Sequence, residues 1–236
     1  MKSKTKISYV ILKYDDQTDN IYTKTLNNGN HVYEIPNSEY VQKADSTLSD
    51  IKKYIIGKLI DFNTTIDENH LFIPFVNVTV DKGIRIYNYV ALILESNQNT
   101  FSSMNFESWH RVKLNQRERV WNLAWGSGLT DSVDFKFKNT AIMDYAANPK
   151  DSHEITFSNV MHFIDEQTND FPILGLLSGN KFTMKQVFHY QDLLGVEALK
   201  AGDNATFENQ YSDSIQAIKD NRITTSYKIK NDYLKK

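Results

Sequence analysis

The stretch KFTMKQVFHYQDLLG, Lys181–Gly195, contains the start signal, the apolar stripe and the stop signal of a complete helix. Thr183 stands in the N-cap position, and Gln186 three residues later predicts a capping box. The apolar residues recur at helical spacing: Val187, Tyr190, Leu193 and Leu194. Gly195 suits the left-handed residue that ends many helices. A self-contained helix this late in the chain predicts that a small compact unit follows a larger one.

A second helix and a strand are predicted downstream. In NATFENQYSDSIQAIK, residues 204–219, apolar side chains again recur at helical spacing, with Asn204 or Thr206 as N-cap: Phe207, Tyr211, Ile215 and Ile218. ITTSYKIK, residues 223–230, alternates like an edge strand. The preceding DFPILGLLSGN, residues 170–180, is rich in proline and glycine and is interpreted as a joint. Helix, turn, helix and β-wing predict a winged helix-turn-helix over residues 171–236.

Residues 1–170 alternate between strand-like and helical patterns. Strands are predicted at residues 6–13, 21–26, 31–36, 70–80, 84–95, 109–114, 120–125 and 133–138, and helices at residues 46–62 and 156–167. Ser46 or Thr47 is the expected cap of the first helix, and Asp81-Lys82-Gly83 predicts a hairpin. This order predicts an α+β sandwich, a mixed sheet with flanking helices, over residues 1–170.

Composition excludes several classes of protein. With 40% hydrophobic and 12% aromatic residues a folded core is expected, and a net charge of −2 predicts no global attraction to nucleic acid or anionic membrane. The absence of cysteine excludes disulfides, thiolate nucleophiles and cysteine-based zinc sites, and the histidines lack metal-binding spacing. No apolar run is long enough to span a membrane, and the basic start is interpreted as a strand rather than a signal peptide. We expect a cytoplasmic protein without a metal or other cofactor.

The C-terminal unit resembles a known family. Phe182-Thr183-Met184 begins the helix, Leu193-Leu194-Gly195 ends it, and NATFENQ follows a short turn. This phrase resembles the C-terminal module of the Nudix-related transcriptional regulators, the NrtR-like family, in which the phrase runs approximately Phe-Thr-Leu-x-Glu-Leu-Gln before a Leu-Gly close. The resemblance implies a Nudix-like domain that senses an ADP-ribose-like or sugar-type effector and a winged helix that binds operator DNA.

The catalytic motif of Nudix hydrolases is degenerate in this chain. The equivalent segment, residues 35–62, keeps Pro36 but differs at later positions: Asn37 and Ser38 replace glycines, and Lys53 and Tyr54 replace an Arg-Glu pair. Gly57 and Lys58 stand where the resemblance places two metal-binding glutamates. Because a lysine ammonium repels Mg²⁺, we expect a sensor that keeps the loop–helix scaffold without catalytic or metal-binding residues.

The resemblance also implies a set of DNA-contacting residues: Thr206, Asn209, Gln210, Arg222, Lys228 and Lys230. Asn209 and Gln210 can read adenine bidentately, whereas Glu208 and Asp213 oppose phosphate contact. Positive charge would come from the lysine-rich end of the chain, for which a solvated terminus is the alternative.

Trp109-His110-Arg111 combines an aromatic ring, a titratable ring and a cation, a mixture suited to a ligand pocket. Strand alternation predicts that Trp109 and Arg111 face one side and His110 the other. Core packing of Trp109 beside a solvent-facing Arg111 is the alternative. His189, on the Lys181–Gly195 helix, is interpreted as structural.

Three functional hypotheses follow. The first is a ligand-responsive transcriptional regulator that binds a palindromic operator as a homodimer. The second is a Nudix-type hydrolase with an atypical metal site. The third is a protein-interaction module that has lost both activities.

Overall fold

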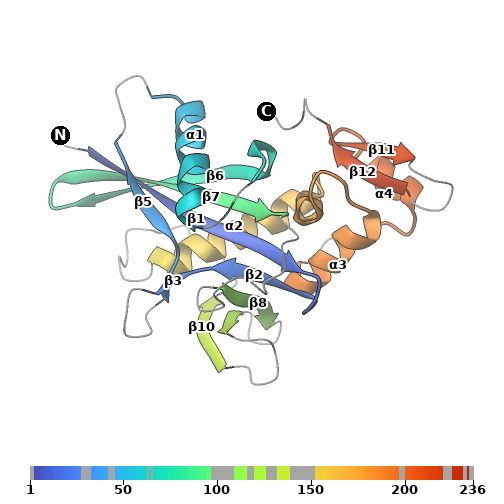
Figure 1. Ribbon diagram of the computed structural model, residues 1–236, viewed down its shortest axis with the longest axis horizontal. Helices are drawn as coiled ribbons and strands as arrows, with labels where there is room; N and C mark the ends of the chain where they lie inside the picture. The colour runs from blue at the N-terminus through green and yellow to red at the C-terminus, as the bar shows by residue number, and fades with distance from the viewer. Residues whose placement is uncertain are drawn as a thin grey trace.

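The computed structural model describes residues 3–27, 33–41, 46–62, 64, 66–96, 109–115, 120–125, 132–138, 152–196, 200–219, 225–230 and 233. Its main sheet runs in the order β10-β9-β8-β2-β1-β7-β6, with β5 also paired to β1 (Figure 1). The strands of this sheet are β1 (Ser3–Asp15), β2 (Asn20–Lys24), β5 (Asn37–Tyr40), β6 (Leu71–Asp81), β7 (Ile84–Glu95), β8 (Trp109–Asn115), β9 (Val120–Trp125) and β10 (Ser132–Lys138). Only β1 and β7 pair in parallel among these described strands, so the sheet is mixed, as predicted.

The remaining elements flank this sheet or follow it. The helices are α1 (Leu48–Leu59), α2 (Ser152–Thr168), α3 (Met184–Leu194) and α4 (Asn204–Gln210), with 3₁₀ turns η1 (Ile60–Phe62), η2 (Glu68–His70) and η6 (Ile173–Ser178). Two small hairpins complete the fold: β3 (Leu26–Asn27) with β4 (Tyr33–Glu34), and β11 (Ile215–Lys219) with β12 (Thr225–Ile229). None of the helices in the described ranges is long and apolar enough to cross a membrane.

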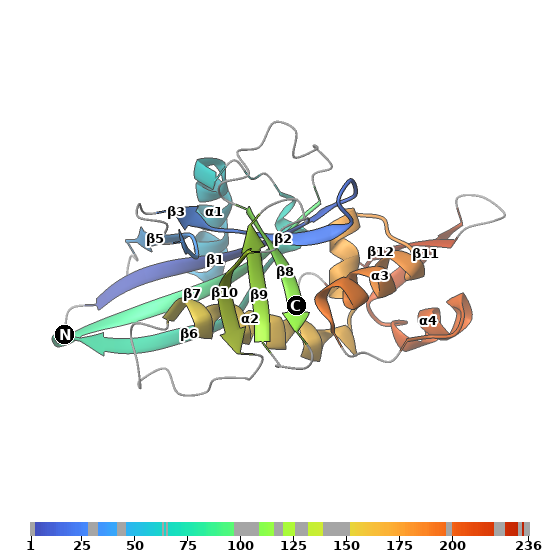
Figure 2. The same cartoon turned by 90° about the horizontal axis from the view of Figure 1, so that it is seen from below.

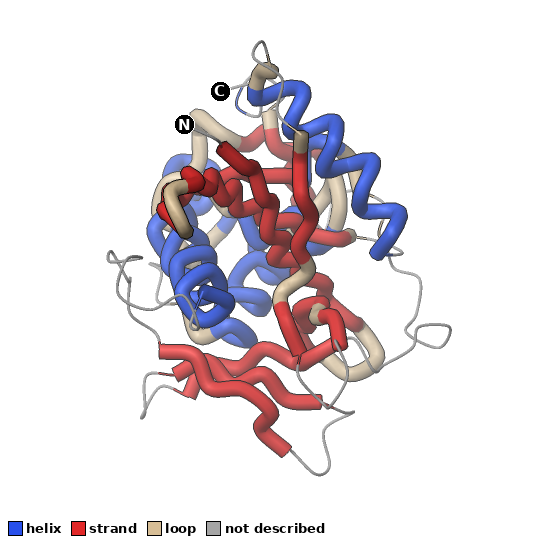
Figure 3. The backbone as a smooth tube through the Cα atoms, turned by 90° about the vertical axis from the view of Figure 1, so that its left-hand side faces the viewer, coloured by secondary structure: helices blue, strands red, loops and turns tan. Residues whose placement is uncertain are grey.

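Helices cover both faces of the sheet (Figure 3). Alternate residues of β1 point to opposite faces, so Tyr9 and Ile11 pack in one core with Ile55 of α1. Val10 and Leu12 pack in a second core with α2, η6 and α3. We call the first face of the sheet the α1 face and the second the α2 face. This two-sided burial explains the nearly continuous apolar run of β1 and confirms the predicted α+β sandwich.

The predicted local signals of the first unit are confirmed. Thr47 caps α1, with Asp50 completing a capping box. Lys82 and Gly83 take φ values of 47° and 77° between Asp81 and Ile84, which pair as the last residues of β6 and the first of β7. Two consecutive positive φ values are those of a type I′ turn, the tight hairpin that the sequence predicted.

The helix predicted over Lys181–Gly195 is also confirmed. The Thr183 Oγ1 accepts from the Gln186 backbone N–H at 3.2 Å, and the Gln186 Oε1 accepts from the Thr183 N–H at 2.8 Å. Gly195 has a φ of 66° and ends the helix. A Cβ at Gly195 would lie 3.0 Å from Leu114 of β8, so the glycine also allows α3 to approach the sheet.

The prediction of one long helix over residues 204–219 is wrong. The helix α4 ends at Gln210, a turn follows, and Ile215 and Ile218 belong to β11, where Ile215 pairs with Ile229 of β12. The N-cap is Asp203, whose side chain accepts a hydrogen bond from the Thr206 N–H. The predicted caps, Asn204 and Thr206, are therefore wrong. Ser212-Asp213-Ser214 favours a turn over a helix, because these short polar side chains compete for backbone hydrogen bonds. The β-wing therefore has two strands.

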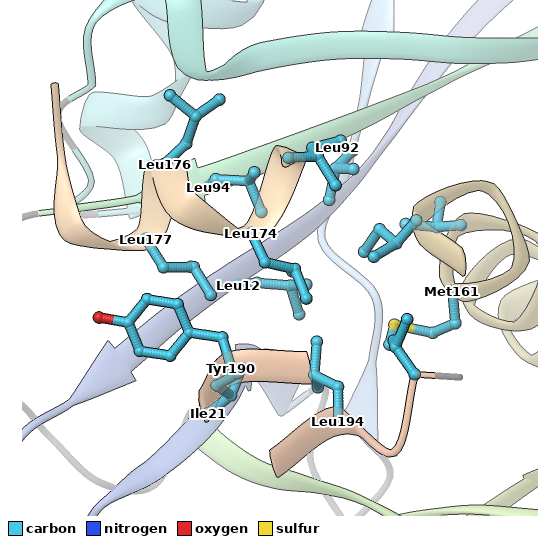
Figure 4. Close-up of a cluster of buried hydrophobic side chains, with 14 of the residues drawn as sticks. Leu12, Ile21, Leu92, Leu94, Met161, Leu174, Leu176, Leu177, Tyr190 and Leu194 are labelled. Carbon is cyan, nitrogen blue, oxygen red and sulfur yellow. The ribbon is translucent and has the colours of Figure 1, made fainter. Parts of the chain in front are cut away.

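The segment interpreted as a joint is buried. Ile173, Leu174 and Leu176 of η6 are almost fully buried, in the core that also contains Leu194 of α3 (Figure 4). A Cβ at Gly175 would come within 2.7 Å of the Phe182 ring, so η6 packs directly against the start of the second unit. One continuous core thus crosses residue 170, and the predicted boundary between residues 1–170 and 171–236 remains a prediction.

Candidate functional site

The predicted ligand residues lie on β8, beside β2 on the α1 face of the sheet. Trp109 pairs with Lys24, and Arg111 pairs with Tyr22, so the two side chains share one face, as strand alternation predicted. His110 points the other way, and its Nδ1 lies 3.0 Å from the Thr25 Oγ1. Figure 2 shows β8 next to β2 in the middle of the molecule.

Trp109 is a core residue in this structure. Only 2% of its surface is exposed, and the Lys24 ammonium lies 5.2 Å from the centroid of its ring, a cation–π contact. Arg111 is half-buried. Arg111 is thus the more accessible of the two for a ligand, and the assignment of both residues to a ligand site stays a prediction.

A buried cluster of charges, which sequence reasoning missed, lies on the same face. The Lys13 Nζ lies 3.6 Å from the Glu95 Oε1, and both side chains are at most 2% exposed. The Thr64 Oγ1 donates to the Glu95 Oε2 at 3.4 Å. Lys24 is also buried, and its ammonium donates to the Phe62 carbonyl at the end of η1. We call Lys13, Lys24, Thr64 and Glu95 the buried charge cluster.

Burial shifts the pKa values of Glu95 and Lys24. It raises the pKa of the Glu95 carboxyl, and Lys13, Lys24 and the Thr64 hydrogen bond oppose that rise. Burial lowers the pKa of Lys24, against the attraction of Glu95. The sequence offered two signs of this cluster, a lysine within the apolar run of β1 and a glutamate at the end of β7. Only the parallel register of the two strands, which places Lys13 opposite Glu95, brings the two charges together.

The positions that replace the Nudix glutamates lie on the outer side of α1. Gly57 is exposed, with open space where a side chain would be, and the Lys58 ammonium pairs with the Asp61 carboxylate at 2.9 Å. Lys53 is exposed, and the Tyr54 hydroxyl donates to the Glu39 carbonyl. Neither Gly57 nor Lys58 has a side-chain oxygen, so these side chains do not fit a divalent metal. Across the described part of the chain, no three acidic or histidine side chains gather as a metal site would require.

The candidate DNA-binding unit is held together by aromatic rings. Phe207 of α4 is fully buried, and its ring centroid lies 5.8 Å from that of Phe188 on α3 and 5.0 Å from that of Tyr227 on β12. The centroid of the Tyr211 ring lies 4.8 Å from that of Phe207. One side chain therefore joins α3, α4 and the wing, which gather at one end of the molecule in Figure 1.

The candidate residues of α4 lie on its outer side. Thr206 and Asn209 are exposed and Gln210 is half-buried, so all three are at the surface. Glu208 is turned toward the wing, where its Oε1 accepts from the Tyr227 hydroxyl at 3.2 Å. Burial raises the pKa of Tyr227 to about 12, and the Glu208 carboxylate adds to that rise. The carboxylate that opposes phosphate contact is thus partly engaged within the unit.

The candidate lysines of the wing differ in their contacts. Lys228 is exposed on β12, opposite Gln216 of β11. Lys230 is also exposed, but its ammonium donates to the Ser212 carbonyl at 2.6 Å. Arg222 lies outside the described residues. Lys228 is therefore the better candidate for a phosphate contact, and the DNA-contacting roles of all these residues remain predictions.

No protein-family model and no curated protein matches the sequence. Solved structures do match the fold. A MutT/nudix family protein from Enterococcus faecalis matches with a TM-score of 0.68 at 12% identity, over 98% of this chain and 89% of that chain. Shewanella oneidensis NrtR matches with a TM-score of 0.58 at 13% identity, over 97% of this chain and 95% of that chain.

The same NrtR complexed with a 27mer DNA matches with a TM-score of 0.56 at 14% identity, over 98% of this chain and 95% of that chain. These matches run along nearly the whole chain, so they include both the mixed sheet and the C-terminal helices with their hairpin. At identities this low, a shared structure establishes the fold. The chain has the fold of NrtR along nearly its whole length, with a Nudix-like mixed sheet followed by α3, α4 and the β11–β12 hairpin, as the resemblance over Phe182–Gln210 implied.

Proposed function

We propose that the protein is a ligand-responsive transcriptional regulator. A non-catalytic Nudix-like sensor, residues 1–170, would bind a nucleotide-sugar or other sugar-type metabolite, and a winged helix, residues 171–236, would bind operator DNA. The observation that carries this proposal is the match to NrtR in complex with DNA, which spans 98% of this chain. The exposed side of α4, with Asn209, and the exposed Lys228 of the wing supply base-reading and phosphate-binding groups.

The test of DNA binding is a mobility-shift titration with the DNA upstream of the protein's own gene at low salt, because phosphate contacts weaken steeply with salt. We expect a discrete complex that resists competition by unrelated DNA. A chain that forms no complex at low salt would contradict the proposal. ADP-ribose and related nucleotide sugars, added one at a time, then test whether an effector changes the affinity.

A homodimer is part of this proposal, and β6 offers a surface for it. In the described sheet β6 is the terminal strand, and Val76, Val78 and Val80 on one of its faces are 42%, 52% and 63% exposed. A row of exposed valines on an edge strand is a surface that proteins usually cover. Val78→Lys should shift the mass measured by light scattering from dimer toward monomer, and Val41→Lys, at another exposed valine, is the control.

Hydrolysis is the second candidate, because the MutT/nudix protein from Enterococcus faecalis matches with the TM-score of 0.68. Gly57 and Lys58 argue against it, since neither side chain binds a divalent cation. Release of nucleoside monophosphate from ADP-ribose in the presence of Mg²⁺ would favour the hydrolase. If neither DNA binding nor hydrolysis occurs, the protein-interaction module becomes the better hypothesis, and the exposed Asp213 beside α4 agrees with it.

A further inference from the structure

The turn between β1 and β2 contacts α3 through a side-chain cluster that the proposed function does not use. The Nε2 of His189 donates to the Oδ1 of Asp19 at 2.5 Å, and the Tyr14 hydroxyl donates to the same oxygen at 2.9 Å. The Tyr14 ring packs on Tyr190, with 4.7 Å between centroids. We call Tyr14, Asp19, His189 and Tyr190 the latch. It joins two segments that lie 170 residues apart in the sequence.

The latch residue Asp19 has an unusual backbone conformation. Asp19 has a φ of 52°, a left-handed conformation that is costly for a residue other than glycine and that aspartate tolerates better than most. The two hydrogen bonds lower the pKa of the Asp19 carboxyl, the one from His189 having the larger effect. The hydroxyl of the latch residue Tyr190 also lies 2.7 Å from the Ser178 Oγ of η6. The latch therefore contacts both the turn and the middle of α3.

The same turn is bonded to side chains that face α1. The Thr18 Oγ1 donates to the Asp15 Oδ2 at 2.6 Å and lies 3.0 Å from the Tyr22 hydroxyl. The Thr18 backbone N–H also donates to the Asp15 Oδ2. Tyr22 is buried and pairs with Arg111, the accessible candidate for a ligand contact. Adjacent residues of one turn thus bond to opposite faces of the sheet, Thr18 to the α1 face and Asp19 to α3.

The contact between α3 and the sheet is not fully satisfied. Gln191, the residue after Tyr190, is fully buried, and neither atom of its amide group has a hydrogen-bond partner among the described residues. A buried amide without partners costs about 1–3 kcal/mol. This cost offsets part of the apolar burial of Val187, Tyr190 and Leu194 that holds α3 on the sheet, and the latch adds to that burial. An element with two opposing tendencies can be shifted by a small change at either end.

We propose that the latch sets the position of α3, and with it α4 and the wing, and that the Thr18 hydroxyl ties this position to Tyr22 and Asp15 on the α1 face. A molecule bound beside Tyr22 would then move the turn and change how α3 is held. The role of the latch in regulation rests on the proposed function. Its role in positioning α3 does not.

The test measures the position of α3 directly and needs neither DNA nor an effector. The chain has no cysteine, so Lys6→Cys on β1 and Lys185→Cys on α3, both at exposed positions, accept one nitroxide label each. Pulsed electron resonance then gives the distribution of distances between the sheet and α3. Asp19→Asn weakens the latch, and Thr18→Val removes only the hydroxyl that reaches Asp15 and Tyr22. Asp16→Asn makes the same chemical change in the same turn, at an exposed side chain that forms no hydrogen bond to a described residue and acts on Tyr14 and Tyr190 only through its charge.

We expect a wider and shifted distance distribution for Asp19→Asn and for Thr18→Val, and an unchanged one for Asp16→Asn. A distribution for Asp19→Asn equal to that of the control would overturn the latch. A shift with Asp19→Asn but none with Thr18→Val would overturn its tie to the α1 face. DNA titrations of the same proteins distinguish failure of the latch from failure of the proposed function. If none of the proteins binds DNA, the proposed function is wrong, and the measured distances still test whether the latch positions α3.

Discussion

The ammonium of Lys13 and the carboxylate of Glu95 lie 3.6 Å apart on the two parallel strands of the sheet, with both side chains almost completely buried. Taking two charges out of water is costly, and their attraction compensates for this cost only while both are present. Removing one partner leaves a charge in an apolar surrounding. The stability of the fold should therefore be sensitive to a substitution of either residue alone. The intact ion pair need not contribute net stability.

We predict that Glu95→Gln lowers the free energy of unfolding by about 3–5 kcal/mol, because Lys13 and Lys24 then remain buried without an anion. Urea denaturation measures this change. Glu39→Gln is the matched control, since Glu39 pairs with Lys4 at 3.9 Å on the surface and should matter by less than about 1 kcal/mol. The double variant Lys13→Met with Glu95→Gln should cost less than the sum of the two single changes, and additive costs would show that the two groups do not interact.

Two glycines should respond in opposite ways to alanine. Gly57 lies inside α1 with no atom within 4 Å of an added Cβ, so Gly57→Ala should raise the free energy of unfolding by about 0.5–1 kcal/mol. Gly195 has a φ of 66° and Leu114 at 3.0 Å from an added Cβ, so Gly195→Ala should lower it by more than about 1 kcal/mol. Thermal unfolding of both variants checks the pair. A destabilising Gly57→Ala would mean that this position needs glycine for another reason.

The DNA-binding residues should separate into two kinds. Lys228→Ala should weaken binding to all DNA sequences alike and reduce the slope of log K against log salt by about 1, because one phosphate contact is lost. Gln210→Ala should instead reduce the preference for the operator over unrelated DNA. Lys230→Ala should change the salt slope less than Lys228→Ala, since the Lys230 ammonium already binds the Ser212 carbonyl. Equal slopes for all three variants would argue against these roles.

Local signals in the sequence predicted most of the fold, and the largest error arose where a distant contact decides the structure. The capping box of Thr183 and Gln186 and the turn at Lys82-Gly83 depend on neighbouring residues, so both were predictable. Ile215 and Ile218 fit a helical stripe with Phe207, yet they form a strand because Ile215 pairs with Ile229. Strand pairing of this kind is a tertiary contact that overrides local spacing.

The candidate site followed the same rule. Alternation along β8 placed Trp109 and Arg111 on one face, as predicted, but it could not show that Trp109 would be covered by Lys24. The pairing of Lys13 with Glu95 depends on the parallel register, and the contact of His189 with Asp19 depends on how α3 docks. No periodic pattern in the sequence indicates that Lys13 lies near Glu95 or that Asp19 lies near His189.

The stability contributed by Asp19 should depend on pH. Its pKa is lowered in the folded protein, so the unfolded chain takes up a proton first as the pH falls. The contribution is present above the ordinary aspartate pKa of about 4 and is lost as the pH falls through the lowered folded value. The difference in Tm between the wild type and Asp19→Asn should therefore be largest near neutral pH and shrink toward pH 2.

Gln191→Leu should stabilise the protein by about 1–3 kcal/mol, because leucine fills a similar volume without burying an amide that has no partner among the described residues. The change should also hold α3 more firmly on the sheet. Hydrogen exchange of the α3 amides should therefore slow, and the distance distribution between labels at positions 6 and 185 should narrow. If an effector acts by moving α3, its effect on DNA affinity should become weaker in this variant. Loss of stability in Gln191→Leu would mean that the amide has a partner and that the contact between α3 and the sheet is already satisfied.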